Sequence, residues 1–340
     1  MYCWSASLFA SLANSANYVK RLMVFEMKAT RLFSIVGIFL FAYILMNIDI
    51  HRTLEIVSKA NLSLIALALL TMATTVTMKS MKWKALVEIY SRGFPLKSAL
   101  KAWLMGFSLS MVTPARVGDV SRAYYIKQRI GFGKGLATVI IDRVIDIGIL
   151  FCLAISGLAI FMSFFFEQSG ILLIISALFM LFVLAVYAST KKGFVRFLLK
   201  PLFKRFVPEG RKSDLNEGFH EFYRGLSHMR KSRRSLLLAV AIGFSAWLMN
   251  VIFYYLLCLS IGIDTSYLFL LSVMPIVALL DTLPISFSGL GTRDAALILF
   301  FSFAAIGKEY AVSLSFLILV FGYLSIGMAG AALFLREHIK

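Results

Sequence analysis

The sequence predicts an all-α membrane protein that crosses the bilayer several times. Of its 340 residues, 60% are hydrophobic and only 15% are charged, and the mean hydropathy is +0.86. Soluble domains carry about 25% charged residues. Several apolar runs also approach the ~20 residues that a helix needs to cross a bilayer. These observations predict six full spans and two broken elements, arranged as two inverted repeats.

The predicted elements follow the apolar runs in order. A cytoplasmic tail is expected over residues 1–30. Its first nineteen residues lack the basic start of a signal peptide, so cleavage is not expected. Full spans are predicted over residues 32–50, 62–78, 136–166, 171–188, 236–260 and 312–335. Shorter apolar pieces occupy residues 102–112, 268–280 and 295–306, and loops are expected over residues 51–61 and 131–135. Since about 13 residues are short for a ~30 Å hydrocarbon core, we expect the short pieces to be broken or re-entrant.

The longest segment between spans, residues 191–235, is basic and soluble in character. Apolar residues recur in it at helical spacing, at Leu215, Phe219, Phe222, Tyr223, Leu226 and Met229. Ser213 and Asp214 are placed to cap such a helix. A basic amphipathic helix can lie on an anionic membrane surface, or it can pack under the helix bundle, and the pattern allows both.

The placement of basic residues predicts the orientation of the chain. The segments 20–31, 79–101, 116–134, 191–235 and 336–340 together hold 30 lysines and arginines, whereas the loops at the other ends of the spans hold 3. The positive-inside rule therefore predicts a cytoplasmic (inner) membrane protein with both termini in the cytoplasm. The same bias accounts for the net charge of +18, so we expect no nucleic-acid partner.

The two halves of the chain have the same predicted layout. Residues 31–168 and 169–340 each hold three spans, with a broken element before the last. Because three is odd, the second half is expected to be inverted relative to the first. Inverted repeats with discontinuous helices are typical of transporters. In the alternative, the pieces around 268–306 each cross, which gives eight spans and a cytoplasmic second motif.

A first charged motif interrupts the apolar pattern before the third span. Thr113 and Pro114 predict a helix start, with threonine as the cap and proline at the first helical position. Arg116, Asp119 and Arg122 follow at spacings that let them interact on a helix. A helix N-terminus offers free N–H donors and a partial positive charge, and guanidinium groups suit phosphate. We therefore expect these three residues to bind an anionic headgroup, the alternative being an ordinary loop.

The second motif, residues 281–296, repeats this arrangement. Thr292 is predicted to cap a helix, and Asp281 with Pro284 is predicted to close the helix before it. A turn rich in glycine and serine can hold an anion on its backbone N–H groups. The residues expected to bind the same headgroup are Ser288, Gly289, Gly291, Arg293 and Asp294. Tight helix packing at the glycines is the alternative.

The third span carries charge near its start. Asp142 and Asp146 lie one helical turn apart, and Arg143 is spaced to pair with Asp146. Two buried carboxylates so close together raise each other's proton affinity. We expect Arg143 to help bind the headgroup, and Asp142, Asp146 and Asp281 to carry coupling protons. Structural ion pairing alone is the alternative.

Nine charged residues fall at bilayer depth in this prediction. They are Arg116, Asp119, Arg122, Asp142, Arg143, Asp146, Asp281, Arg293 and Asp294. Unpaired, they would cost roughly 20–30 kcal/mol on insertion scales, which exceeds the net stability of ~5–15 kcal/mol typical of proteins. We therefore expect these residues to pair with one another, to face water, or to lie at the interface.

The stretches TPARVGDVSR, IDRVIDIG and LPISFSGLGTRDAAL, in this order, resemble the membrane region of lysylphosphatidylglycerol synthases, which is shared with flippase-like integral membrane proteins. The resemblance covers about residues 30–335. It implies a lipid flippase, with relatives linked to aminoacylated phosphatidylglycerol or polyprenyl-phosphate lipids. Asp119, Asp142 and Asp294 stand where the family is expected to have glutamate, and Ser288 where it commonly has glycine. The soluble aminoacyltransferase domain is not in this sequence, so lysine transfer is not implied.

The function predicted from the sequence is translocation of an anionic or phosphate-bearing lipid across the membrane. The alternatives are a membrane enzyme that modifies a lipid headgroup, with Asp119 or Asp142 as base, and an accessory subunit of a partner transferase. Nucleotide-binding fingerprints and hydrolase triads are absent from the sequence. Cys3, Cys152 and Cys258 are scattered and the histidines form no cluster with them, so no metal or cofactor is expected.

Overall fold

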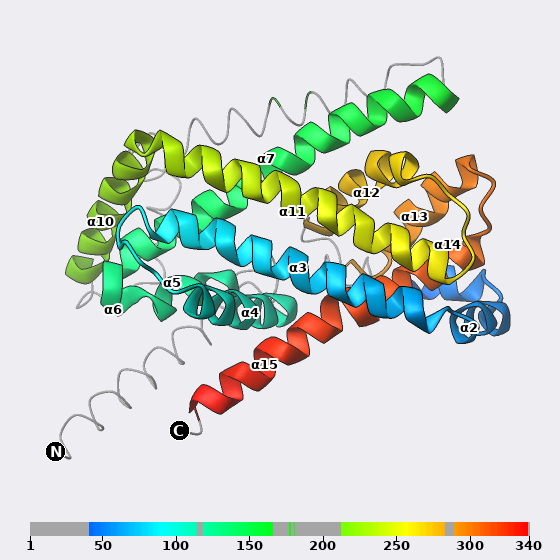
Figure 1. Cartoon of the computed structure of the whole chain (residues 1–340), viewed down its shortest axis with the longest axis horizontal. Helices are drawn as coiled ribbons and strands as arrows, with labels where there is room; N and C mark the ends of the chain where they lie inside the picture. Colours follow the sequence, from blue (N-terminus) through cyan, green and yellow to red (C-terminus); the bar gives the residue numbers. More distant parts are fainter. Residues whose placement is uncertain are drawn as a thin grey trace.

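All regular secondary structure is helical over the residues that the computed structural model describes, which are 41–113, 118–165, 212–282, 289–338 and the isolated residues 177 and 180 (Figure 1). This confirms the predicted all-α membrane class. The elements are α2 (Ile50–Ser58), α3 (Leu62–Val87), α4 (Leu96–Val112), α5 (Ser121–Tyr125), α6 (Lys127–Ile130), α7 (Phe132–Phe165), α10 (Lys212–Lys231), α11 (Arg233–Ser260), α12 (Tyr267–Thr282), α13 (Thr292–Phe303), α14 (Lys308–Leu317), the π-helix η3 (Ile318–Leu324) and α15 (Ser325–His338).

Four helical stretches of the described chain are long and apolar enough to cross a membrane. They are Leu62–Val87, Phe132–Phe161, Arg233–Ser260 and the continuous run Lys308–Arg336. The predicted span over 171–188 falls almost wholly outside the described residues. The predicted span over 32–50 is described only from residue 41, and its helix ends at Met46.

Three predicted boundaries are wrong. Residues 51–61 were expected to be a loop, but α2 begins at Ile50, because the Asp49 carboxylate accepts the Arg52 N–H and caps it. The second span was expected to end at residue 78, but α3 continues to Val87. Lys79, Lys82 and Lys84, which were predicted to lie in a loop, are therefore part of α3. Likewise α7 begins at Phe132, directly after Gly131, so the predicted loop over 131–135 is mostly helix.

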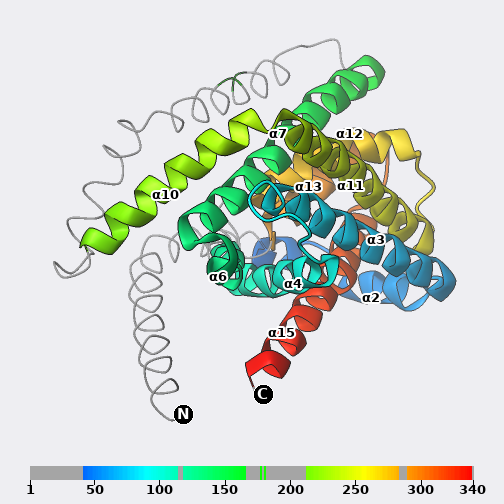
Figure 2. The same cartoon turned by 60° about the vertical axis from the view of Figure 1, so that its left-hand side comes forward.

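The spans α3 and α11 run antiparallel and define two ends of the bundle. At one end the Asn61 N–H donates to the Ser260 carbonyl (2.8 Å). At the other end the Tyr90 hydroxyl donates to the carbonyl of Gly225 in α10 (2.7 Å). We call these the α2 end and the α10 end, and they lie at the right and left of Figure 1. α10 packs along the start of α7 (Figure 2).

The first broken element is a hairpin that enters and leaves at the α10 end. α4 begins there, and α6 returns there, since Ile130 packs with Phe94 and Val87 in one buried cluster. The end of α4 lies inside the bundle, because Met111 lies against Gly327, about two thirds of the way along the last span. Thr113 closes α4, because its hydroxyl donates to the Leu109 carbonyl (2.9 Å), and the same oxygen accepts the Gly118 N–H (2.8 Å). The helix start predicted at Pro114 lies outside the described residues.

The second broken element is a hairpin that enters and leaves at the α2 end. Phe161, near the end of its span, packs against Phe269 at the start of α12 and against Phe303 at the end of α13. α12 has 16 residues and so extends only about 24 Å. At the tip, Arg293 contacts Ser315, in the interior of the last span. These contacts favour the re-entrant arrangement over the eight-span alternative.

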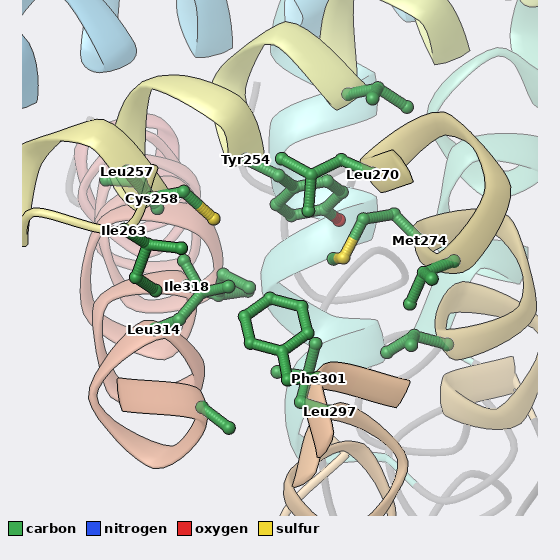
Figure 3. Close-up of a cluster of buried hydrophobic side chains, with 14 of the residues drawn as sticks. Tyr254, Leu257, Cys258, Ile263, Leu270, Met274, Leu297, Phe301, Leu314 and Ile318 are labelled. Carbon is green, nitrogen blue, oxygen red and sulfur yellow. The ribbon is translucent and has the colours of Figure 1, made fainter. Parts of the chain in front are cut away.

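The largest apolar core lies toward the α2 end and holds the second hairpin in place. Figure 3 shows Tyr254, Leu257 and Cys258 of α11 facing Leu270 and Met274 of α12, with Leu297 and Phe301 of α13 and Leu314 and Ile318 of the last span closing the cluster. Leu257, Leu270, Leu297, Phe301 and Leu314 are fully buried. Both hairpins are thus packed parts of the bundle.

Candidate functional site

The charged residues of the first motif and the third span come together in one cluster between α3, the first hairpin and α7. We call it the charge cluster. Its members are Lys79, Lys82, Asp119, Arg122, Asp142, Arg143 and Asp146. It brings together four basic side chains and three carboxylates. The expectation that charges at this depth pair with one another is confirmed for the residues of the cluster that the structure describes.

Lys82 holds the centre of the charge cluster. Its side chain is 0% exposed, and its Nζ lies 3.0 Å from Asp142 Oδ1 and 2.7 Å from Asp146 Oδ1. The Trp247 indole N–H also donates to Asp146 (3.3 Å). Removing paired charges from water is tolerable only when the geometry of the pair is good. Asp142 and Asp146, which were predicted to share one helix face, therefore both pair with Lys82. That lysine was predicted to lie in a loop.

Arg122 and Arg143 tie the first hairpin to α7. Arg122, 1% exposed, places Nη1 2.9 Å from Asp142 Oδ2 and Nη2 3.6 Å from Asp119 Oδ1. Arg143 bonds to the other oxygen of Asp119. Arg143 thus forms an ion pair with Asp119, because the hairpin brings Asp119 against α7, and Asp146 forms one with Lys82. Gly106 makes room for the Arg122 side chain, since an added Cβ would lie 2.7 Å from its Cγ.

The second motif forms a separate buried group around Arg293. Its Nε donates to Ser315 Oγ (2.8 Å) and its Nη2 to the Ser315 carbonyl (3.2 Å). Nη1 lies 4.0 Å from Asp281 Oδ2, which also accepts the Tyr323 hydroxyl (3.0 Å). The guanidinium lies over the Tyr323 ring. Arg293 thus joins both arms of the second hairpin to the π-helical part of the last span, a type of distortion that is frequent at functional sites.

The glycines of the second motif shape its turn. Gly291, not Thr292 as predicted, caps α13, because the turn requires the left-handed backbone (φ +84°) that glycine adopts without strain. Its N–H donates to Asp294 Oδ2 (2.8 Å). Gly289 also has a positive φ of +80°, and a Cβ there would lie 2.4 Å from Asp281 Oδ1. The buried Asp294 therefore stabilises the helix start.

A cavity of about 420 Å³ lies between the two hairpins and has walls from both. We call it the central cavity. Its polar or charged lining residues are Thr75, Lys79, Asp119, Arg143, Asp146, Trp247, Asn250, Tyr254, Thr282 and Tyr323. The rest of the lining is apolar and includes Met72, Phe107, Leu150, Phe253, Ile318 and Ile326. This volume falls within the range of ~300–1,000 Å³ typical of ligand pockets, and the mixture of surfaces suits an amphipathic molecule.

The predicted site residues divide into three groups by position. Asp119, Arg143 and Asp146 line the central cavity. Arg122, Asp142, Asp281, Gly289, Gly291, Arg293 and Asp294 lie behind its lining and hold it together. Arg116 and Ser288 lie outside the described residues, so their predicted contacts with a headgroup stay predictions. The two motifs meet across one cavity through Asp119 of the first and Thr282 of the second.

Sequence reasoning missed the lysines of α3 and the aromatic partners. Lys79 lines the central cavity with its Nζ 4.2 Å from the centre of the Trp247 ring. Lys79 and Lys82 are three residues apart, which was the available signal that they share one helix face. Tyr323 has no such signal, since it lies in an uninterrupted apolar run. No cluster of three or more histidine, cysteine, aspartate or glutamate side chains suited to a metal occurs in the described part of the chain.

Comparison with known proteins places these features in a family. The profile of a family described as "Lysylphosphatidylglycerol synthase TM region" matches residues 31–330. A UPF0104 membrane protein of Methanocaldococcus jannaschii is 27% identical over 304 residues, 85% of this chain and 89% of the relative. Relatives of the same description from Methanothermobacter thermautotrophicus (82% of this chain and 87% of the relative) and Pyrococcus horikoshii (83% and 90%) are each 23% identical.

Proposed function

Because the chain belongs to the family of the lysylphosphatidylglycerol synthase TM region, we propose that this multi-pass membrane protein translocates an anionic or phosphate-bearing lipid across the bilayer. The observation that carries the proposal is the central cavity between two hairpins that enter the bundle from opposite ends. Transporters with inverted repeats bind their substrates between broken helices at mid-depth.

The charge on the cavity favours an anionic group. Lys79 and Arg143 line it together with Asp119 and Asp146, and the whole charge cluster holds one more cation than carboxylates. Arg143 keeps 30% of its side chain exposed, whereas Lys82 and Arg122 have 0%. In the proposal, Lys79 and Arg143 contact the headgroup phosphate by charge-assisted hydrogen bonds. Lys82, Arg122 and Arg293 position the walls, and the apolar lining takes the start of the acyl or prenyl chain.

The proposal is tested by reconstitution of the full chain into phosphatidylcholine vesicles that contain a trace of fluorescent phosphatidylglycerol or fluorescent polyprenyl phosphate. An impermeant quencher reports movement between leaflets. We expect faster movement than in empty vesicles, and about tenfold slower movement for Arg143→Ala, the loss expected for one charge-assisted contact. Arg129→Ala is the matched control, because Arg129 is exposed and binds Ser91 outside the cavity. Absence of acceleration for every lipid tried would remove the proposal.

The two alternatives predict other results in the same system. A membrane enzyme would produce a new lipid species on thin-layer analysis, with little movement of the original lipid. An accessory subunit would leave both measurements at the level of empty vesicles, and its phenotype in cells would survive Arg143→Ala. Each outcome therefore points to a different class of function.

A further inference from the structure

A second pocket lies at the α10 end of the molecule, outside the central cavity. It has a volume of about 730 Å³ and shares no lining residue with the central cavity. Its walls come from α10, from the residues just after α3 and from the first turn of α7. The lining residues are Ile89, Tyr90, Lys134, Glu221, Arg224, Ser227, His228 and Lys231. We call it the α10 pocket.

One stripe of α10 forms a wall of the α10 pocket. Glu221, Arg224, His228 and Lys231 recur at intervals of three or four residues, so they lie on one face of the helix. A helix packed on a bundle normally turns apolar residues toward its neighbours. Here a polar, mainly basic stripe faces a hollow beside the apolar contacts of Tyr223 and Met229. The pocket is therefore lined by charged side chains at a place where a helix that only packed on the bundle would present apolar ones.

The α10 pocket has more positive than negative charge. Lys134, Arg224 and Lys231 line it, and none of them forms an ion pair within the described part of the chain. The carboxylate in the lining is that of Glu221, whose Oε2 accepts the Gly133 N–H at the start of α7 (3.0 Å). Because that carboxylate is used to fix α10 on α7, the basic side chains remain available for an anion.

The α10 pocket lies where three candidate spans begin or end. Tyr90 follows the end of one span, Lys134 lies in the first turn of another, and Lys231 lies two residues before the start of a third. Basic side chains at span ends meet the headgroup region of the bilayer. The Tyr90 hydroxyl donates to the Gly225 carbonyl (2.7 Å), and burial raises the pKa of Tyr90, so this bond persists as pH rises. Hydrogen bonds between side chains and backbone thus fix α10 at the wall of the pocket.

We propose that the α10 pocket binds the phosphate of an anionic ligand, separately from any substrate in the central cavity. Arg224, Lys231 and Lys134 supply the charge, and His228 supplies a further ring nitrogen. A lipid headgroup at the membrane surface and a soluble phosphate share this chemistry. Occupancy would strengthen the contact between α10 and the start of α7, the helix that also carries Asp142, Arg143 and Asp146.

The test measures binding to the purified full chain in neutral detergent by microscale thermophoresis. The probes are dioctanoyl phosphatidic acid, inorganic phosphate, and dioctanoyl phosphatidylcholine as the neutral lipid. All proteins carry Arg143→Ala, so that binding in the central cavity contributes little and failure of the proposed function leaves this result unaffected. We expect Arg224→Ala with Lys231→Ala to weaken binding of phosphatidic acid by at least about tenfold.

The matched control removes the same charge from the same region. Arg230→Ala with Arg234→Ala takes away two exposed arginines that do not line the pocket, and it should change affinity less than about twofold. If inorganic phosphate competes with phosphatidic acid, the ligand is a soluble phosphate. If it does not compete, the ligand is a lipid headgroup. Both results support the site. Equal losses in the two double variants, or equal binding of phosphatidylcholine, would overturn it. Elution of all variants as wild type on gel filtration shows that they are folded.

Discussion

At the scale of single residues, the charges of the cluster other than Lys79 form a balanced network of three cations and three carboxylates, in which each member pairs with another. Lys82 contacts two carboxylates, Asp142 contacts two cations, and Asp119 contacts two arginines. Such a network costs desolvation energy, and its members stabilise the fold mainly by preventing one another from being buried alone. Loss of one member is therefore expected to cost more than loss of a surface pair.

Lys82 provides the sharpest test of this idea. Replacing Lys82 by methionine keeps the length of the side chain but leaves Asp142 and Asp146 without their shared cation. We expect the free energy of unfolding to fall by about 3–5 kcal/mol, measured by thermal or denaturant unfolding in detergent with tryptophan fluorescence. Combining it with Asp146→Asn should restore part of the loss, since the charge of the network is then balanced again.

Lys84→Met is the control on the same helix. Lys84 pairs with Glu88 at 2.7 Å, and both side chains are about 30% exposed, so the loss should be about 0.3–0.5 kcal/mol. Similar losses for the two lysines would show that the buried network does not stabilise the fold as argued.

The sequence predicted most of this network but not its centre. The acids and arginines were visible because they interrupt apolar runs. Lys82 was not, because Lys79, Lys82 and Lys84 resemble the basic border of a span that has already ended. Whether a lysine near a span end reaches water or turns inward depends on the neighbouring helix, and Asp142 lies 60 residues further along the chain.

At the scale of elements, the two hairpins depend on turns that only particular residues permit. Their existence was predicted from length, since the apolar pieces are too short to cross. Their caps were not predicted: Thr113 ends a helix and Gly291 begins one. A threonine hydroxyl can form hydrogen bonds with backbone groups at the start or at the end of a helix. The neighbouring sequence does not show which of the two ends Thr113 occupies. The π-helix Ile318–Leu324 was not predicted either, because the hydropathy of this run is the same as that of an ordinary span.

Gly289 tests the second hairpin. Alanine there combines a positive φ of +80° with a Cβ only 2.4 Å from Asp281 Oδ1. The strain of the backbone alone costs about 1–2 kcal/mol, and the clash must displace the carboxylate that holds Tyr323 and faces Arg293. We expect Gly289→Ala to lower the unfolding temperature strongly and to slow lipid movement in the vesicle assay.

Gly93→Ala separates the two causes. Gly93 has a similar φ of +71°, but a Cβ there would meet nothing within 4 Å. It should therefore show the cost of the backbone conformation without the clash. If both variants lose the same stability and Gly289→Ala keeps full transport, contact between the turn and Asp281 has no role in the site.

At the scale of the whole molecule, the arrangement of the hairpins follows from a simple physical constraint. The helices of both hairpins have 17 residues or fewer, which is less than the ~20 that a crossing needs. The chain must therefore return to the side from which each hairpin entered. Irregular backbone at mid-depth is tolerated only where protein or a water-filled cavity surrounds it. The two hairpins enter the bundle from opposite ends and leave the central cavity between them.

The ends of the hairpins should consequently face opposite sides of the membrane. Single cysteines are placed at exposed positions of a variant lacking Cys3, Cys152 and Cys258: Arg92 and Gln128 flank the first hairpin, and Asp264 and Gly307 flank the second. With a membrane-impermeant maleimide, the first pair should be labelled in inside-out vesicles and the second in intact cells, because the basic α10 end is expected in the cytoplasm. The reverse pattern would invert the predicted orientation but keep the hairpins. Labelling of all four positions from one side would contradict the inverted arrangement, and with it the alternating access that lipid translocation through this cavity requires.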